Sequence, residues 1–204
     1  LVLTSNTATA NQTVCENSSI VNIIYTFGGT ATGATVTGLP AGVTASVTGN
    51  TVTISGTPTT ATGSPFTYTV TTTGGACGSP SLTGTITVKP TDTLVLTSGS
   101  TTNAQTVCLN SALTAIEYTF GGTVTGATVT GLPAGVTYAV SGNTVTITGA
   151  PSTLTGSPFT YNVNTTGGTC GSPSLTGTIT VQPLATLVLT SNTATANQTV
   201  CENS

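Results

Sequence analysis

The sequence predicts an all-β protein made of tandem β-sandwich domains, and three observations support this fold class. First, the pentapeptide LVLTS occurs at residues 1, 94 and 187, which gives a repeat of 93 residues. Second, short runs of alternating apolar and polar residues are separated by Gly, Pro and Asn, the pattern of strands and turns. Third, the apolar residues are rich in β-branched Val and Ile, and no useful length of chain has helical periodicity.

The repeat defines the expected domains. Without gaps, residues 1–93 and 94–186 agree at 68 of 93 positions, about 73%. The stretch 187–204 matches residues 1–18 at every position but differs from residues 94–111 at six. A period of 93 residues is the size of a whole small domain. We therefore expect an alternating array: 1–93 (type A), 94–186 (type B), and the start of a third repeat, type A again, at 187–204.

Alternating runs place the strands within each repeat. Gly49-Asn50 lies between two such runs and predicts a two-residue hairpin turn, as does Gly142-Asn143 in the second repeat. Short strands in this number, within about 90 residues, are typical of an immunoglobulin-like β-sandwich. In the first repeat the expected strands are Leu1–Thr4, Gln12–Cys15, Ile20–Phe27, Ala34–Thr37, Val43–Thr48, Thr51–Ser55, Pro65–Thr73 and Leu82–Val88.

Aromatic residues recur one period apart, which favours a role in the core over a sugar-binding platform. Tyr138 has no aromatic counterpart, since the first repeat has Ala45, but it shares the parity of Val136 and Val140 and is also expected to point inward. The recurring residues are Tyr25, Phe27, Phe66 and Tyr68, followed by Tyr118, Phe120, Phe159 and Tyr161.

Charged residues make up 2% of the chain, with one Lys, four acidic residues and no His or Arg. A Ser-His-Asp triad, a His-ligated metal and an arginine phosphate clamp are therefore impossible, and we expect neither an enzyme nor a cofactor. A net charge of −3 with a single Lys also argues against nucleic acid and anionic lipid as partners.

The sequence also lacks the residues needed to bind calcium and those needed to span a membrane. Glu16, Asp92 and Glu117 stand singly, whereas Ca²⁺ takes several clustered oxygen ligands, so we expect no metal site. No stretch approaches the roughly 20 consecutive apolar residues of a membrane-spanning helix, so we expect no membrane insertion in this segment. The chain begins without Met or a signal peptide, and we interpret it as a piece of something longer.

Cysteines occur twice in each complete repeat, which predicts one disulfide per domain in an oxidising compartment. The expected pairs are Cys15–Cys77 and Cys108–Cys170, while the partner of Cys201 would lie beyond the sequence. Each bridge would close about 62 residues and stabilise its domain by roughly 4 kcal/mol on the loop-entropy model. The alternative is that each pair of cysteines is a redox or metal-binding pair. Such a pair would need a nearby His, Lys or Arg side chain to activate the thiolate.

The repeats also carry a resemblance. Each contains GLPAGVT, then GNTVTISGTP (GNTVTITGAP in the second repeat), then SPFTY and a Gly-Gly followed closely by Cys. This pattern resembles the PKD-like and immunoglobulin-like repeats of giant surface adhesins of Bacteroidota, including the gliding-motility adhesin of flavobacteria, and it covers both complete repeats. The resemblance implies extracellular β-sandwich repeats on a cell surface, exported by signals that lie outside this window.

A modification site is suggested in the same way. Asp92-Thr93-Leu94 resembles the short Asp-Thr/Ser-aliphatic signal for O-glycosylation in Bacteroidota, which would make Thr93 the acceptor. The second repeat has Ala185 in place of the Asp. A solvated linker aspartate is the alternative interpretation of Asp92.

The function that these observations favour is structural: a stalk or filament segment of a repetitive bacterial cell-surface adhesin. The expected partners are the neighbouring repeats of the same chain and other copies in a fibre. The short linker 89–93 contains Pro90, which restricts swinging between domains. The alternative is a binding module whose repeats themselves adhere to surface polysaccharide or to ice.

Overall fold

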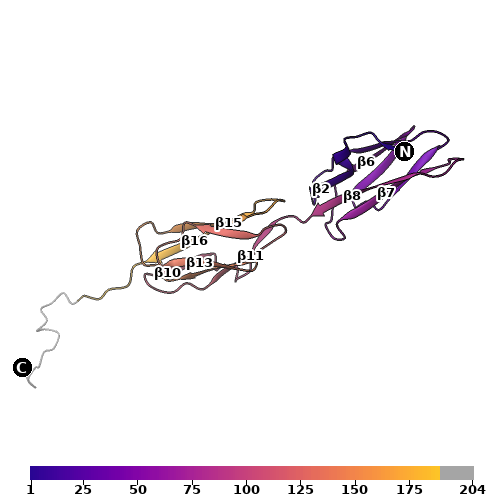
Figure 1. Ribbon diagram of the computed structural model, residues 1–204. Helices are drawn as coiled ribbons and strands as arrows, with labels where there is room; N and C mark the ends of the chain where they lie inside the picture. Colours follow the sequence, from indigo (N-terminus) through magenta and orange to yellow (C-terminus); the bar gives the residue numbers. More distant parts are fainter. Residues whose placement is uncertain (189–204) are drawn as a thin grey trace, which may run out of the picture.

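The computed structural model describes residues 1–188, which form two β-sandwiches lying end to end (Figure 1). Strands make up the regular structure of this stretch, apart from one short 3-10 turn, η1 (Thr7–Ala10). The first sandwich runs from Val2 to Lys89 and the second from Thr93 to Gln182. The structure thus places Thr93 in the first strand of the second sandwich.

Two four-stranded sheets form the first sandwich. One has the order β1-β3-β6-β5 and the other the order β2-β8-β7-β4. After β1, the turn η1 carries the chain across to the second sheet, where β2 pairs parallel with β8. The strands are β1 (Val2–Leu3), β2 (Asn11–Cys15), β3 (Ile23–Thr26), β4 (Gly33–Thr37), β5 (Val43–Thr48), β6 (Thr51–Gly56), β7 (Phe66–Thr73) and β8 (Ser81–Lys89).

The second sandwich repeats this arrangement. Its sheets have the orders β9-β11-β14-β13 and β10-β16-β15-β12, and β10 pairs parallel with β16. Its strands are β9 (Thr93–Leu96), β10 (Ala104–Cys108), β11 (Ile116–Gly121), β12 (Gly126–Thr130), β13 (Val136–Ser141), β14 (Thr144–Gly149), β15 (Phe159–Thr166) and β16 (Ser174–Gln182).

Each core is built from the inward face of these strands. In the first repeat the hydroxyl of Tyr25 lies 2.9 Å from that of Tyr68, which in turn donates to the carbonyl of Ala10 at 3.1 Å. The Tyr68 ring lies against Gly84, where any Cβ would collide with the phenol oxygen. The buried tyrosines therefore satisfy their polar ends inside the core, and the second repeat does the same with Tyr118 and Tyr161.

The predicted all-β fold is confirmed, with local differences. The hairpin at Gly49-Asn50 joins β5 to β6 as expected, while the strand predicted at Ile20–Phe27 is limited to β3. The turn η1 was not predicted. Tyr138 lies on the inward face as expected, directly opposite the buried Ile147, but it is still 39% exposed, because β13 is an edge strand on which only Val136 is covered.

Candidate functional site: a bridged joint between the repeats

The linker between the two sandwiches is three residues long, from Pro90 to Asp92. Strand β8 enters it at Lys89, and Cys15 at the end of β2 lies beside Lys89 in the parallel register. The amide of Glu16 donates to the carbonyl of Lys89 at 2.8 Å and fixes the chain just after Cys15. Cys15 is therefore held at the end of the first sandwich that faces the second.

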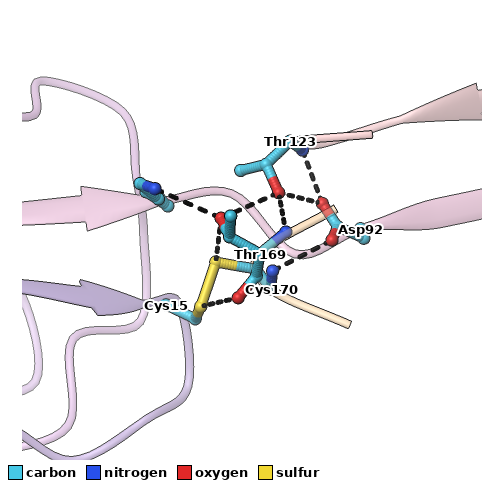
Figure 2. Close-up of a disulfide and its surroundings, with 6 residues drawn as sticks. Cys15, Asp92, Thr123, Thr169 and Cys170 are labelled. Atoms are coloured by element: carbon cyan, nitrogen blue, oxygen red, sulfur yellow. Dashed lines mark hydrogen bonds between the residues drawn. A yellow bond between two sulfur atoms is a disulfide. The ribbon is translucent and has the colours of Figure 1, made fainter. Parts of the chain in front are cut away.

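A disulfide crosses this joint: Cys15 is bonded to Cys170, with 5.4 Å between their Cα atoms (Figure 2). Cys170 lies in the loop between β15 and β16 of the second repeat. The bridge thus connects consecutive repeats at a sequence separation of 155 residues.

The predicted pairs Cys15–Cys77 and Cys108–Cys170 are therefore wrong. Cys15 lies beside the last residue of β8, whereas Cys77 precedes its first residue, Ser81. These positions are separated by the length of β8, on the order of 25 Å at ~3.3 Å per residue. Cysteines can be bridged only when their Cα atoms are closer than about 7 Å. Cys77 and Cys108 are exposed free thiols in the structure, and Cys201 lies outside the described residues.

Asp92 fastens the linker to the loop that carries Cys170. Its Oδ1 accepts hydrogen bonds from the backbone N–H and the hydroxyl of Thr123, at 2.5 and 2.7 Å. Its Oδ2 accepts from the N–H of Cys170 at 2.9 Å, and its own N–H donates to the Cys170 carbonyl at 3.3 Å. Asp92 is only 6% exposed, so its interpretation as a solvated linker residue is wrong.

A directed chain of hydrogen bonds runs across the joint (Figure 2). The ammonium of Lys89 donates to Oγ1 of Thr169 at 3.2 Å, and this hydroxyl donates to Oγ1 of Thr123 at 3.1 Å. The Thr123 hydroxyl donates its proton to Asp92. Both ends of the chain are charged, which strengthens its terminal hydrogen bonds. Lys89 is the only Lys of the sequence, and its ammonium group makes a hydrogen bond across the joint.

These contacts act on the ionisation of Asp92. Burial raises the pKa of its carboxyl, but hydrogen bonds from the side chain and backbone of Thr123 and from the backbone of Cys170 lower it, as does the positive charge of Lys89. The net effect is a pKa below the ordinary aspartate value of 3.8. Asp92 is therefore a carboxylate at neutral pH, and all of its contacts at the joint favour that form.

Two glycines make room for the aspartate. Gly122 has a φ of +79°, and a Cβ there would collide with the backbone of Thr91 and Asp92. At Gly168 a Cβ would collide with the carboxylate of Asp92 itself. The linker can pack against the second repeat at this point because both positions lack a side chain.

Three residues of the joint fall at positions where the two repeats differ. Lys89, Asp92 and Thr169 correspond to Gln182, Ala185 and Ala76 one period away. The underlying loop contact is common to both repeats, since the N–H of Ala76 donates to Oγ1 of Thr30 as that of Thr169 does to Thr123. Sequence reasoning missed Lys89, Thr123 and Thr169. A comparison of the positions at which the repeats differ could have found Lys89 and Thr169.

Thr93, the residue predicted to be O-glycosylated, has an exposed side chain beside this joint. Glycosylation there stays a prediction. Among residues 1–188, no group of three or more His, Cys, Asp or Glu side chains could hold a metal ion. Within the same stretch, no helix is long and apolar enough to cross a membrane.

Comparison with solved structures identifies the fold. The chain is similar to the insect immune protein hemolin, with a TM-score of 0.52 and 12% identity over 84% of this chain and 45% of that one. The fold is immunoglobulin-like. A tandem of titin, A168169, is similar at a TM-score of 0.47 and 13% identity, over 84% of this chain and 94% of the titin chain. No protein-family model matches the sequence, and no curated protein matches it.

Proposed function

We propose that this chain is a structural segment of a repetitive bacterial cell-surface adhesin, in which tandem immunoglobulin-like repeats form an extracellular stalk or filament. The observation that carries the proposal is the disulfide between Cys15 and Cys170 of consecutive repeats. A covalent bond placed between domains, in addition to the linker, opposes bending of the joint. A stiff joint of this kind suits a protein that holds a distant binding tip away from a surface.

The same disulfide supports an oxidising, extracellular location for the protein. Disulfides persist in oxidising environments, which include the cell surface and the secreted space, and are rare in the cytosol. The resemblance of the GLPAGVT and GNTVTISGTP motifs to adhesin repeats of Bacteroidota supports the same location and suggests a gliding-motility type of adhesin.

Immunogold electron microscopy of intact cells that express the protein tests the proposal, with antibodies against residues 1–186. We expect gold particles along thin fibres outside the cell, at many positions on each fibre because the repeat recurs. Label confined to the cell interior, or to compact particles without fibres, would contradict the stalk or filament role.

A second candidate function is adhesion of the repeats themselves to polysaccharide, and Tyr138 is the observation that favours it. Tyr138 is 39% exposed on the edge strand β13, and Val140, two residues further along the same face, is 40% exposed. Aromatic rings with an exposed face stack on sugars, although a single ring per pair of repeats offers little area. Binding of the immobilised chain to a polysaccharide array, compared with a Tyr138→Ala variant, separates this function from a passive stalk.

A further inference from the structure

The free thiols of Cys77 and Cys108 stand at positions that match the two ends of the observed bridge. Cys108 ends β10 beside Gln182, as Cys15 ends β2 beside Lys89. Cys77 lies between β7 and β8, as Cys170 lies between β15 and β16. Both thiols are exposed. We call Cys15 and Cys108 the first cysteine of their repeats, and Cys77 and Cys170 the second cysteine. The first cysteine lies at the end of the repeat that faces the next repeat, and the second cysteine lies at the opposite end.

We propose that every joint of the array is bridged in the same way, so that Cys108 bonds the second cysteine of the following repeat and Cys77 bonds the first cysteine of the preceding one. The partner in each case is another repeat of this chain. In each bridge two thiols lose two protons and two electrons to a disulfide-containing oxidant of the compartment, which is reduced to its dithiol. The inference rests on the tandem array of the proposed function but not on its location at a bacterial surface.

Two covalent connections then cross each joint, the backbone linker and the disulfide. A covalent path along the array can be followed from one disulfide to another. It reaches a repeat through the disulfide at that repeat's second cysteine, follows the backbone into the next repeat, and leaves through the disulfide at that repeat's first cysteine. In the described chain these two positions are Cys77 and Cys108, only 108 − 77 = 31 residues apart. This stretch contains β8, the linker, β9 and β10. A continuous covalent path therefore advances by two repeats for every 31 residues of backbone.

The path limits how far the array can stretch. Thirty-one residues reach at most about 105 Å when fully extended, at ~3.4 Å per residue. Two folded sandwiches already span roughly 70–90 Å, given strands of up to nine residues and their end loops. Without bridges, two unfolded repeats of 186 residues would reach about six times the bridged limit. Force would thus pass along β8, β9 and β10, and an equivalent path through Cys15–Cys170 would use β1, β2 and β16. The other strands of each domain would lie outside both paths.

The test uses a chain of three complete repeats, in which a copy of residues 1–93 follows residue 186. Free thiols are alkylated before digestion without reductant, and the peptides are identified by mass spectrometry. We expect Cys108 to be protected and joined to the second cysteine of the third repeat, Cys15 to be joined to Cys170, and Cys77 to be alkylated. Changing the second cysteine of the third repeat to Ser should expose Cys108 to alkylation again.

Alkylation of Cys108 in the unmutated three-repeat chain, or its recovery with Cys170, would overturn the inference. Stretching single molecules of a longer array, in which every joint can be bridged, gives an independent readout: the contour length per two repeats should rise about sixfold when the bridges are reduced. An equal contour length with and without reductant would also overturn it. Neither measurement depends on where the protein is located, so a failure here is distinct from a failure of the proposed function.

Discussion

Asp92 and Cys170 hold each other by two hydrogen bonds, one from the Asp92 N–H to the Cys170 carbonyl and one from the Cys170 N–H to the Asp92 carboxylate. Asp92 belongs to the linker, and Cys170 is the residue of the second repeat that is bonded to the first. The linker and the disulfide therefore meet at one point of the second domain. A joint fixed in this way has little freedom to bend.

The first prediction concerns Asp92→Ala, which copies Ala185 of the following linker. The substitution removes three hydrogen bonds to the carboxylate, two from Thr123 and one from the N–H of Cys170. We expect the bridge still to form, because the two cysteines come from the folded sandwiches, but to be reduced by dithiothreitol several times faster. Glu117→Ala, at an exposed acid remote from the bridge in β11, is the matched control and should leave the rate unchanged. Equal rates for all three proteins would contradict the role of Asp92.

The second prediction is a dependence of stability on acid pH. Because the pKa of Asp92 is lower in the folded than in the unfolded chain, the unfolded chain binds more protons as the pH falls through the ordinary aspartate value of 3.8. The stabilisation from Asp92 is therefore complete above that pH and is lost as the pH falls through the folded pKa. Thermal unfolding midpoints measured from pH 6 to pH 2 should fall less steeply for Asp92→Asn than for the unmodified chain. Parallel curves would count against the carboxylate contacts.

The third prediction follows from the position of the bridge between domains. With the second repeat folded, unfolding of the first leaves a closed loop from Cys15 to Asp92, which costs about 4 kcal/mol on the loop-entropy model. Cys170→Ser should therefore destabilise the first repeat, which it does not belong to, as well as the second. Native-state hydrogen exchange at the amides of Tyr68 and Tyr161 measures both domains separately. Cys108→Ser is the control, and an effect of Cys170→Ser on the second repeat alone would indicate a bridge within that domain.

The fourth prediction concerns the buried tyrosine pair. Tyr68→Phe leaves the Tyr25 hydroxyl and the Ala10 carbonyl without their partner in a site where Tyr68 is fully buried. We expect a loss of about 1–3 kcal/mol in the free energy of unfolding of the first repeat. Tyr138→Phe, at an exposed position, should change the stability by less than about 0.5 kcal/mol. Urea unfolding of the three proteins provides the measurement, and equal midpoints would show that the pair contributes nothing.

The fold could be predicted because its signals are local. Alternating residues such as Val52 and Ile54 mark the buried face of a strand by themselves, and Gly49-Asn50 marks the turn beside it. The exposure of Tyr138 could not be read in this way. Its parity is that of a core residue, but it lies on an edge strand that the other sheet covers only at Val136. The alternation of residues along a strand identifies the face of the sheet on which a side chain lies. Whether that side chain is buried depends on which residues of the other sheet cover it.

The site was predicted in its residues but not in its connections. Counting two cysteines per repeat led to pairs within each repeat, although Cys15 and Cys77 lie at opposite ends of the sandwich. That separation arises from the parallel pairing of β2 with β8, a contact between residues 74 positions apart that no local pattern reveals. Asp92 was noticed for its sequence motif, but its burial depends on the packing of one domain against the linker.

The bridge across the joint is tested most directly by mapping the disulfide in the 204-residue chain. Thiols are alkylated under native conditions, and the unreduced protein is digested with pepsin at acid pH, where disulfide exchange is suppressed because thiolates are protonated. We expect a single cross-linked species that joins the peptide of Cys15 to that of Cys170, with Cys77 and Cys108 both alkylated. Recovery of Cys15 joined to Cys77 and of Cys108 joined to Cys170, with neither Cys77 nor Cys108 alkylated, would contradict it.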